Sequence, residues 1–130
     1  MTDDCLEDLK RMCKDLGTKL EMLSEGYIYD KETGELKTRT FTIPDGEEDR
    51  YTDLYGYLSD NLGVTITKNL GDDDCDFRSC CITMAWGGPG IYIDTDAREV
   101  QGRWWGTNYD YALSDEACTE IENCVRNMIF

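Results

Sequence analysis

Carboxylates are the side chains of this sequence best suited to chemistry, and the densest of them stand in four short runs. The runs are Glu47, Glu48 and Asp49; Asp72, Asp73, Asp74 and Asp76; Asp94 and Asp96; and Asp115 and Glu116. Neighbouring carboxylates can act as general acid and base, hold a cation, or present negative charge to a basic partner. The other residue types decide among these three chemistries.

The aspartate-rich run has the spacing of the first ligands of a calcium-binding EF-hand loop. Asp72, Asp74 and Asp76 would occupy loop positions one, three and five. Position six is Phe77 where the loop needs glycine, and position twelve is Thr83 where it needs glutamate. These departures exclude an EF-hand, so we expect a solvated loop and no metal site.

Histidine and cysteine usage removes most nucleophilic chemistry. The chain contains no histidine, so it can form neither a Ser-His-Asp nor a Cys-His arrangement. Its seven cysteines include no C-x-x-C pair, and we expect most of them to be small buried hydrophobes with free thiols. The segment Gly87–Gly90 joins two predicted strands and does not open a helix, as a phosphate-binding loop would. We therefore expect no enzyme and no cofactor, with a carboxylate-based enzyme as an alternative.

Net charge is the strongest functional signal. Twenty-eight acidic and 13 basic residues give a formal net charge of −15. Duplex DNA carries one negative charge per ~1.7 Å of axis, and a globule of this length is roughly 36 Å across. The chain thus approaches DNA in charge per unit length and could occupy a lysine- and arginine-lined groove that normally holds phosphates. We expect a basic protein partner and no direct nucleic-acid binding.

A β-meander forms the predicted centre of the fold. Apolar and polar residues alternate along Cys80–Trp86, Ile91–Asp94 and Glu99–Trp105, which is the pattern of half-buried strands. Short polar or glycine-rich segments join them. We expect one core beneath the helices, to which these strands contribute Trp86, Ile91, Ile93, Val100 and Trp104.

A leucine stripe predicts a long N-terminal helix from Thr2 to about Gly26. Leu6, Leu9, Cys13, Leu16, Leu20 and Leu23 recur at spacings of three and four. We expect this helix to pack on its own sheet. The alternative is a homodimer seam through Leu6, Leu9, Leu16, Leu20 and Leu23, against which Gly17 argues because glycine weakens a helix.

The remaining segments complete a single α+β domain over residues 1–130, with three helices and an antiparallel sheet of five or six strands. The pattern predicts a hairpin of Tyr27–Tyr29 with Leu36–Ile43, a helix from the Glu47 run to Gly63 that includes Tyr51, and a strand Val64–Lys68. It then predicts a polar connection Thr107–Ala112 and a closing helix after Ser114 with Glu120 and Glu122 facing outward. The absence of a signal peptide and of a long apolar run predicts a cytoplasmic protein.

The segment of residues 84–106 adds a resemblance. Trp86-Gly-Gly-Pro-Gly-Ile-Tyr-Ile-Asp-Thr followed by Val100, Gly102 and Trp105-Gly106 resembles small acidic proteins of phages and conjugative elements. Several classes of these are anti-CRISPR or anti-restriction inhibitors, many of which mimic nucleic acid. The resemblance implies a host-defence inhibitor whose partner is a CRISPR effector, such as Cas9 or a Cascade subunit, or a restriction enzyme.

Which residues touch that partner is left open by the sequence. The four acidic runs would contact it if the protein mimics nucleic acid, whereas Tyr92, Trp105 and Tyr109 would do so through a hydrophobic contact. A further alternative is a dimeric interaction or assembly protein of a phage or mobile element, without mimicry.

Overall fold

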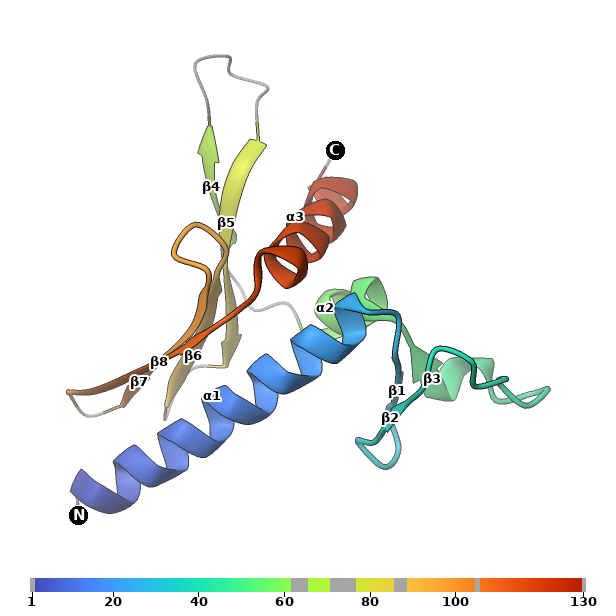
Figure 1. Ribbon diagram of the computed structural model, residues 1–130, viewed down its shortest axis with the longest axis horizontal. Coiled ribbons are helices and arrows are strands. Elements are labelled where there is room, and N and C mark those ends of the chain that lie inside the picture. The colour runs from blue at the N-terminus through green and yellow to red at the C-terminus, as the bar shows by residue number, and fades with distance from the viewer. Residues whose placement is uncertain (1, 62–65, 71–76, 86–88, 105, 130) are drawn as a thin grey trace.

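A five-stranded antiparallel sheet forms the centre of the fold, with helices on one of its faces (Figure 1). The computed structural model describes residues 2–61, 66–70, 77–85, 89–104 and 106–129. The strands lie in the order β4-β5-β6-β7-β8, so each is hydrogen-bonded to its neighbour in sequence. Their bounds are Ile66–Leu70, Phe77–Ala85, Gly90–Asp94, Glu99–Trp104 and Thr107–Ala112.

The meander prediction is confirmed in its strands and in its faces. The register places Ile82, Ile93 and Val100 in one row across β5, β6 and β7, and each of them is fully buried. Ile91 is buried beside them, and Trp104 packs against the core while remaining partly exposed. Trp86 lies outside the described residues. The predicted core beneath the helices therefore holds for the four of its members that are described.

Helices α1 (Thr2–Ser24) and α3 (Asp115–Ile129) supply the other side of that core. Leu9, Leu16, Leu20 and Leu23 of α1 are buried in the chain's own core, and Leu6 is half-buried. The helix therefore packs on its own sheet, and a dimer seam along these leucines would require α1 to leave that sheet. No helix in the described part of the chain is long and apolar enough to cross a membrane.

A glycine on each side of the helix–sheet contact allows this close packing. A Cβ atom at Gly17 of α1 would lie within 2.5 Å of the Tyr111 ring on β8. A Cβ atom at Gly102 of β7 would lie 2.7 Å from the side chains of Leu9 and Cys13. Gly17, taken from the sequence as a weakness of the helix, is thus a contact point with the sheet.

A second, smaller sheet corrects the prediction of one sheet of five or six strands. It contains β1 (Ile28–Asp30), β2 (Leu36–Lys37) and β3 (Tyr51–Thr52) in the order β2-β1-β3. It lies beyond the C-terminal end of α1, away from the β7–β8 end of the larger sheet (Figure 1). Because both edges of β1 are occupied by these short strands, β1 itself cannot pair with a strand of the larger sheet.

An ion pair and an aromatic contact hold this small sheet. Asp30 is fully buried, and Arg50 donates to its carboxylate from Nε at 2.9 Å and from Nη2 at 2.8 Å. The backbone N of Lys31 donates to the carbonyl of Arg50 at 2.8 Å. The rings of Tyr29 and Tyr57 lie 5.0 Å apart and link the sheet to α2 (Leu54–Asn61).

Several predicted boundaries differ from those of the structure. The strand predicted over Leu36–Ile43 ends at Lys37, and the predicted second helix is divided into a short 3-10 helix (η1, Glu48–Arg50), strand β3 and α2. The segment Thr107–Ala112 is not a connection but strand β8. Its asparagine and aspartate have low strand propensity, but pairing with β7 along six residues outweighs that preference.

Candidate functional site

The turn between β6 and β7 presents one of the predicted acidic runs. Asp94 accepts hydrogen bonds at its Oδ1 from the backbone N of Asp96 at 3.0 Å and of Ala97 at 3.1 Å. Arg98 then adopts a left-handed backbone with φ of 59°. This local geometry closes the turn and leaves the Asp96 side chain exposed.

The start of α3 presents a second predicted run beside that turn. Ser114 caps the helix, because its Oγ accepts a hydrogen bond from the backbone N of Ala117 at 3.1 Å. Asp115 and Glu116 follow in the first turn, where the helix dipole stabilises negative charge. Arg98 Nη1 lies 2.8 Å from Asp115 Oδ1, so an ion pair joins the β6–β7 turn to α3.

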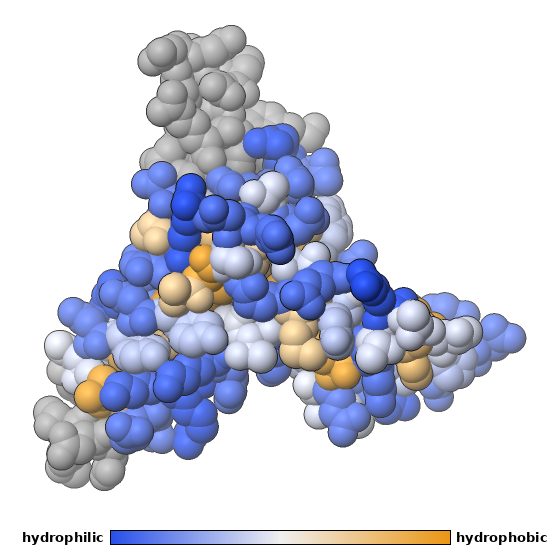
Figure 2. All heavy atoms as spheres, viewed as in Figure 1, coloured by the Kyte–Doolittle hydropathy of each residue, from blue (hydrophilic) through white to orange (hydrophobic). Residues whose placement is uncertain are grey.

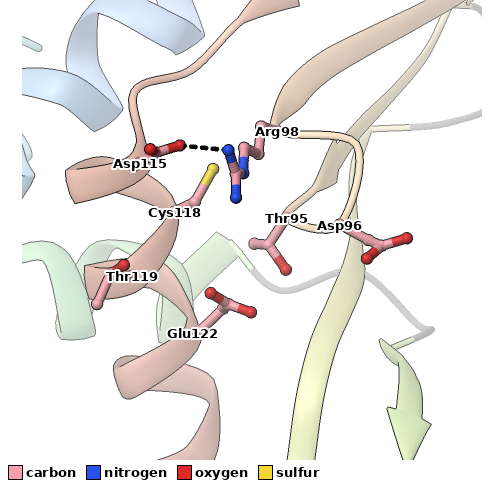
Figure 3. Close-up of a pocket in the computed structure, with 7 residues that line it drawn as sticks. All are labelled: Thr95, Asp96, Arg98, Asp115, Cys118, Thr119 and Glu122. Carbon is pink, nitrogen blue, oxygen red and sulfur yellow. Dashed lines mark ion pairs between the residues drawn. The ribbon is translucent and has the colours of Figure 1, made fainter.

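A shallow polar pocket of about 220 Å³ lies between the turn and the helix. Its lining side chains are Thr95, Asp96, Arg98, Asp115, Cys118, Thr119 and Glu122. Figure 3 shows Arg98, Thr95 and Glu122 directed into the space between strand and helix, whereas Asp96 points away from it. Glu122 is thus half-buried in the pocket and does not face fully outward as the sequence predicts; Glu120 is exposed.

The ionisable groups of the pocket favour electrostatic over nucleophilic chemistry. Burial raises the pKa of Glu122, whereas a hydrogen bond from Thr95 and the charges of Arg126 and Arg98 oppose this shift. Burial, with the nearby charge of Glu122, raises the pKa of the Cys118 thiol to about 11. Cys118 is therefore protonated near neutral pH and cannot act as a thiolate nucleophile there.

Turn and helix together form what we call the turn–helix acidic surface: Asp96, Asp115 and Glu122, which line the pocket, with Asp94 and Glu116 close to them in sequence. Asp96 and Glu116 are exposed and have no ion-pair partner among the described residues. Figure 2 shows mainly hydrophilic side chains over this part of the molecule.

Negative charge is concentrated in the later part of the sequence. Residues 1–40 carry ten acidic and seven basic side chains, whereas residues 41–130 carry eighteen acidic and six basic side chains.

Of the other two acidic runs, one lies at the small sheet and the other cannot be placed from the described residues. Glu47, Glu48 and Asp49 lie at η1 beside the small sheet, where Glu47 Oε2 is 4.0 Å from Arg50 Nη1. Asp72, Asp73, Asp74 and Asp76 lie outside the described residues. The structure therefore brings together two of the four predicted runs.

The aromatic alternative does not form one patch in the described part of the chain. Tyr92 lies opposite Gln101 on the face of the sheet that α1 and α3 leave uncovered. Tyr109 lies on the other face, where Lys10 Nζ is 5.9 Å from its ring centroid. Trp105 lies outside the described residues. Tyr92 and Tyr109 thus cannot contact the same flat surface of a partner.

Several cysteines of the described residues carry free thiols. Cys13, Cys80 and Cys118 are buried free thiols, as expected of small hydrophobes, whereas the free thiols Cys81 and Cys124 are half-buried. In the described ranges, no three histidine, cysteine or acidic side chains lie close enough to hold a metal ion.

Sequence reasoning missed Arg98 and Glu122 as members of the site. Arg98 stands two residues after Asp96, and Glu122 stands two turns of helix after Asp115 on the same side of α3. The second spacing is visible in the sequence, but the proximity of α3 to the turn is not.

Comparison with known proteins finds no family, no curated protein and no solved structure that matches this chain.

Proposed function

We propose that this protein is a host-defence inhibitor that binds a basic groove of a nucleic-acid-binding protein and blocks it by acidic mimicry. The partner would be a CRISPR effector, such as Cas9 or a Cascade subunit, or a restriction enzyme, in the cytoplasm of a bacterial host. The observation that carries the proposal is the meeting of two acidic runs, about twenty residues apart in sequence, on one surface.

The arrangement of charge on the turn–helix acidic surface supports this function. Asp115 is paired with Arg98, but Asp96 and Glu116, which are near this pair in sequence, have no ion-pair partner among the described residues. Their negative charge is thus available to lysine and arginine side chains that otherwise bind phosphates. The ion pair also links the turn to the helix beside the pocket.

Two other functions are less well supported. A carboxylate enzyme would use the pocket, but Asp115 is engaged by Arg98 and Cys118 is protonated, which leaves Glu122 as the main candidate group. An assembly protein that dimerises through α1 would need leucines that are buried in the core. Neither function makes use of the net charge of −15.

The proposal is tested first in cells. The protein is expressed in bacterial strains that each carry one active defence system: a Cas9 system, a Cascade system or a restriction enzyme. We expect a targeted phage to regain its plating efficiency in at least one strain. The purified target should then lose DNA binding when the protein is added, and added salt should weaken the complex.

A matched pair of double variants locates the contact. Asp96→Asn with Glu116→Gln removes two exposed charges from the turn–helix acidic surface, and Glu48→Gln with Asp49→Asn removes two exposed charges near the small sheet. We expect only the first variant to lose inhibition, mainly through a slower association rate. Equal inhibition by both variants, or DNA binding by the target in the presence of saturating protein, would refute the assignment.

A further inference from the structure

Strand β8 is an edge of the five-stranded sheet, and its outer side has no partner among the described strands. The backbone N of Leu113 donates to the carbonyl of Arg98 at 2.9 Å, so Leu113 and Arg98 form a hydrogen-bonded pair at the end of the β7–β8 ladder. Bonded and non-bonded pairs alternate in an antiparallel ladder. The N–H and C=O groups of Asn108, Asp110 and Ala112 therefore point away from β7.

This edge lacks most of the features that keep natural edge strands from pairing. Such strands are usually very short, bulged, or marked by proline or lysine. β8 has six residues, contains neither proline nor lysine, and pairs with β7 without a register shift. Its one charged residue, Asp110, lies 2.8 Å from Arg103 Nη1 of the neighbouring strand, so this single charge is partly offset within the chain.

We propose that a second copy of this chain pairs with β8, antiparallel and about a two-fold axis, so that two five-stranded sheets become one. The helices of both copies would then lie on the same face of the combined sheet, because such an axis is perpendicular to the sheet. This contact is distinct from the leucine seam and uses backbone groups that the monomer leaves without a described partner.

The sequence of β8 selects one register for this pairing. With the axis beside Tyr109, Asn108 lies opposite Asp110 of the second copy, and the amide can donate to the carboxylate. Tyr109 then lies opposite Tyr109 of the second copy, which is a favourable aromatic pair. With the axis beside Asp110, the two Asp110 carboxylates would face each other, and like charges directly opposite are destabilising.

The side chains on the helix side of β8 are suited to being covered in this way. Tyr109 and Tyr111 are both half-buried, and they pack along α1 at Lys10 and Gly17 respectively. In Figure 1 β8 runs alongside α1, at the side of the sheet that a second copy would approach. Pairing would bury the exposed parts of both rings, which adds apolar contact to the backbone hydrogen bonds.

The salt dependence of binding distinguishes this self-association from a complex with a basic partner. Each copy carries a net charge of −15, so two copies repel each other and added salt should strengthen their association. A complex with a basic partner should instead weaken in salt. Self-association and the proposed inhibition can therefore fail independently of each other.

The test compares Asp110→Pro with Asp110→Asn by sedimentation velocity at low and high salt. Proline removes an outward N–H but no hydrogen bond of the β7–β8 ladder, so the monomer fold should persist. We expect the wild type and Asp110→Asn to form dimers that increase with salt. We expect Asp110→Pro to stay monomeric with an unchanged circular dichroism spectrum. A monomeric wild type at high salt, or equal dimerisation of folded Asp110→Pro, would overturn the proposal.

Crosslinking tests the register. In the proposed pairing the two Tyr109 residues form a non-hydrogen-bonded pair, with Cα atoms about 4.5 Å apart, a distance that a disulfide can span. Tyr109→Cys should therefore form a disulfide-linked dimer under mild oxidation, above the background of the wild type. Tyr111→Cys should not, because it faces Thr107 of the second copy. The reverse result would show that the register is wrong.

Discussion

Replacing Gly102 with alanine tests the contact on which the helix–sheet packing depends. The added Cβ atom would lie 2.7 Å from Cys13 Sγ, 2.7 Å from Leu9 Cδ1 and 2.8 Å from Leu9 Cγ. Leu9 and Cys13 are both fully buried, so neither can swing into solvent. Relief of the clash requires α1 to move away from β7.

The expected size of this effect follows from two opposing contributions. Overpacking of a core costs about 1–3 kcal/mol, whereas replacing a strand glycine with alanine gains about 0.5–1 kcal/mol. We therefore expect Gly102→Ala to lower the free energy of unfolding by about 1–2 kcal/mol. In a domain of this size the melting temperature should fall by about 3–8 °C.

A double-mutant cycle with Leu9→Ala isolates the contact. Leu9→Ala alone should cost about 2–5 kcal/mol, but it removes two of the three short contacts of the new methyl group. The cost of Gly102→Ala should then fall by about 1 kcal/mol or more in the Leu9→Ala background, as measured by denaturant unfolding. As a control, Gly90→Ala should cost less, because its nearest neighbour is the hydroxyl tip of half-buried Tyr92.

Either of two results would refute this reasoning. One is a Gly102→Ala protein that is as stable as the wild type. The other is a cost of Gly102→Ala that is the same with Leu9 present or absent, since the clash would then not involve Leu9.

Three further predictions concern other parts of the fold. Val100→Asp places an unpaired charge in the fully buried row and should destabilise the protein by several kcal/mol, so an unchanged melting temperature would contradict the strand register. Hydrogen bonds from Arg50 hold the pKa of Asp30 well below its ordinary value of 3.8. This pair therefore stabilises the protein fully above pH 3.8 and progressively less as the pH falls toward the lowered pKa. The free energy of unfolding, measured against pH, should fall more steeply on acidification for the wild type than for Asp30→Asn. Burial raises the pKa of the Cys80 and Cys118 thiols to about 11, so alkylation followed by mass spectrometry should label them slowly in the folded protein and rapidly after unfolding.

The long helix and the meander could be predicted because their patterns are local. The leucine stripe of α1 and the alternation around Ile93 and Val100 report directly which face of each element is buried. Strand β8 alternates too, with tyrosines 109 and 111 on the helix side, but its asparagine and aspartate resemble those of a loop. What makes it a strand is the neighbouring β7, which a single stretch of sequence does not show.

The small sheet and the acidic surface depend on contacts between distant segments. Asp30 belongs to a turn by its sequence, yet it is buried because Arg50 returns to it from twenty residues away. Likewise, the Asp94 and Asp115 runs are adjacent only because α3 packs near the β6–β7 turn. Spacing along the chain predicted the acidic runs themselves but not which of them would meet.

Arg98 explains how the structure holds these two runs together. A left-handed backbone at a residue other than glycine costs about 1–2 kcal/mol, so glycine would suit this position of the turn better. Glycine has no side chain, however, whereas Arg98 reaches α3 through its ion pair with Asp115. The arginine thus lowers the local net charge by one and holds Asp115, whereas exposed Asp96 and Glu116 have no ion-pair partner among the described residues. In the proposed inhibitor, these two unpaired carboxylates would therefore supply most of the charge that the lysine and arginine side chains of a basic groove meet.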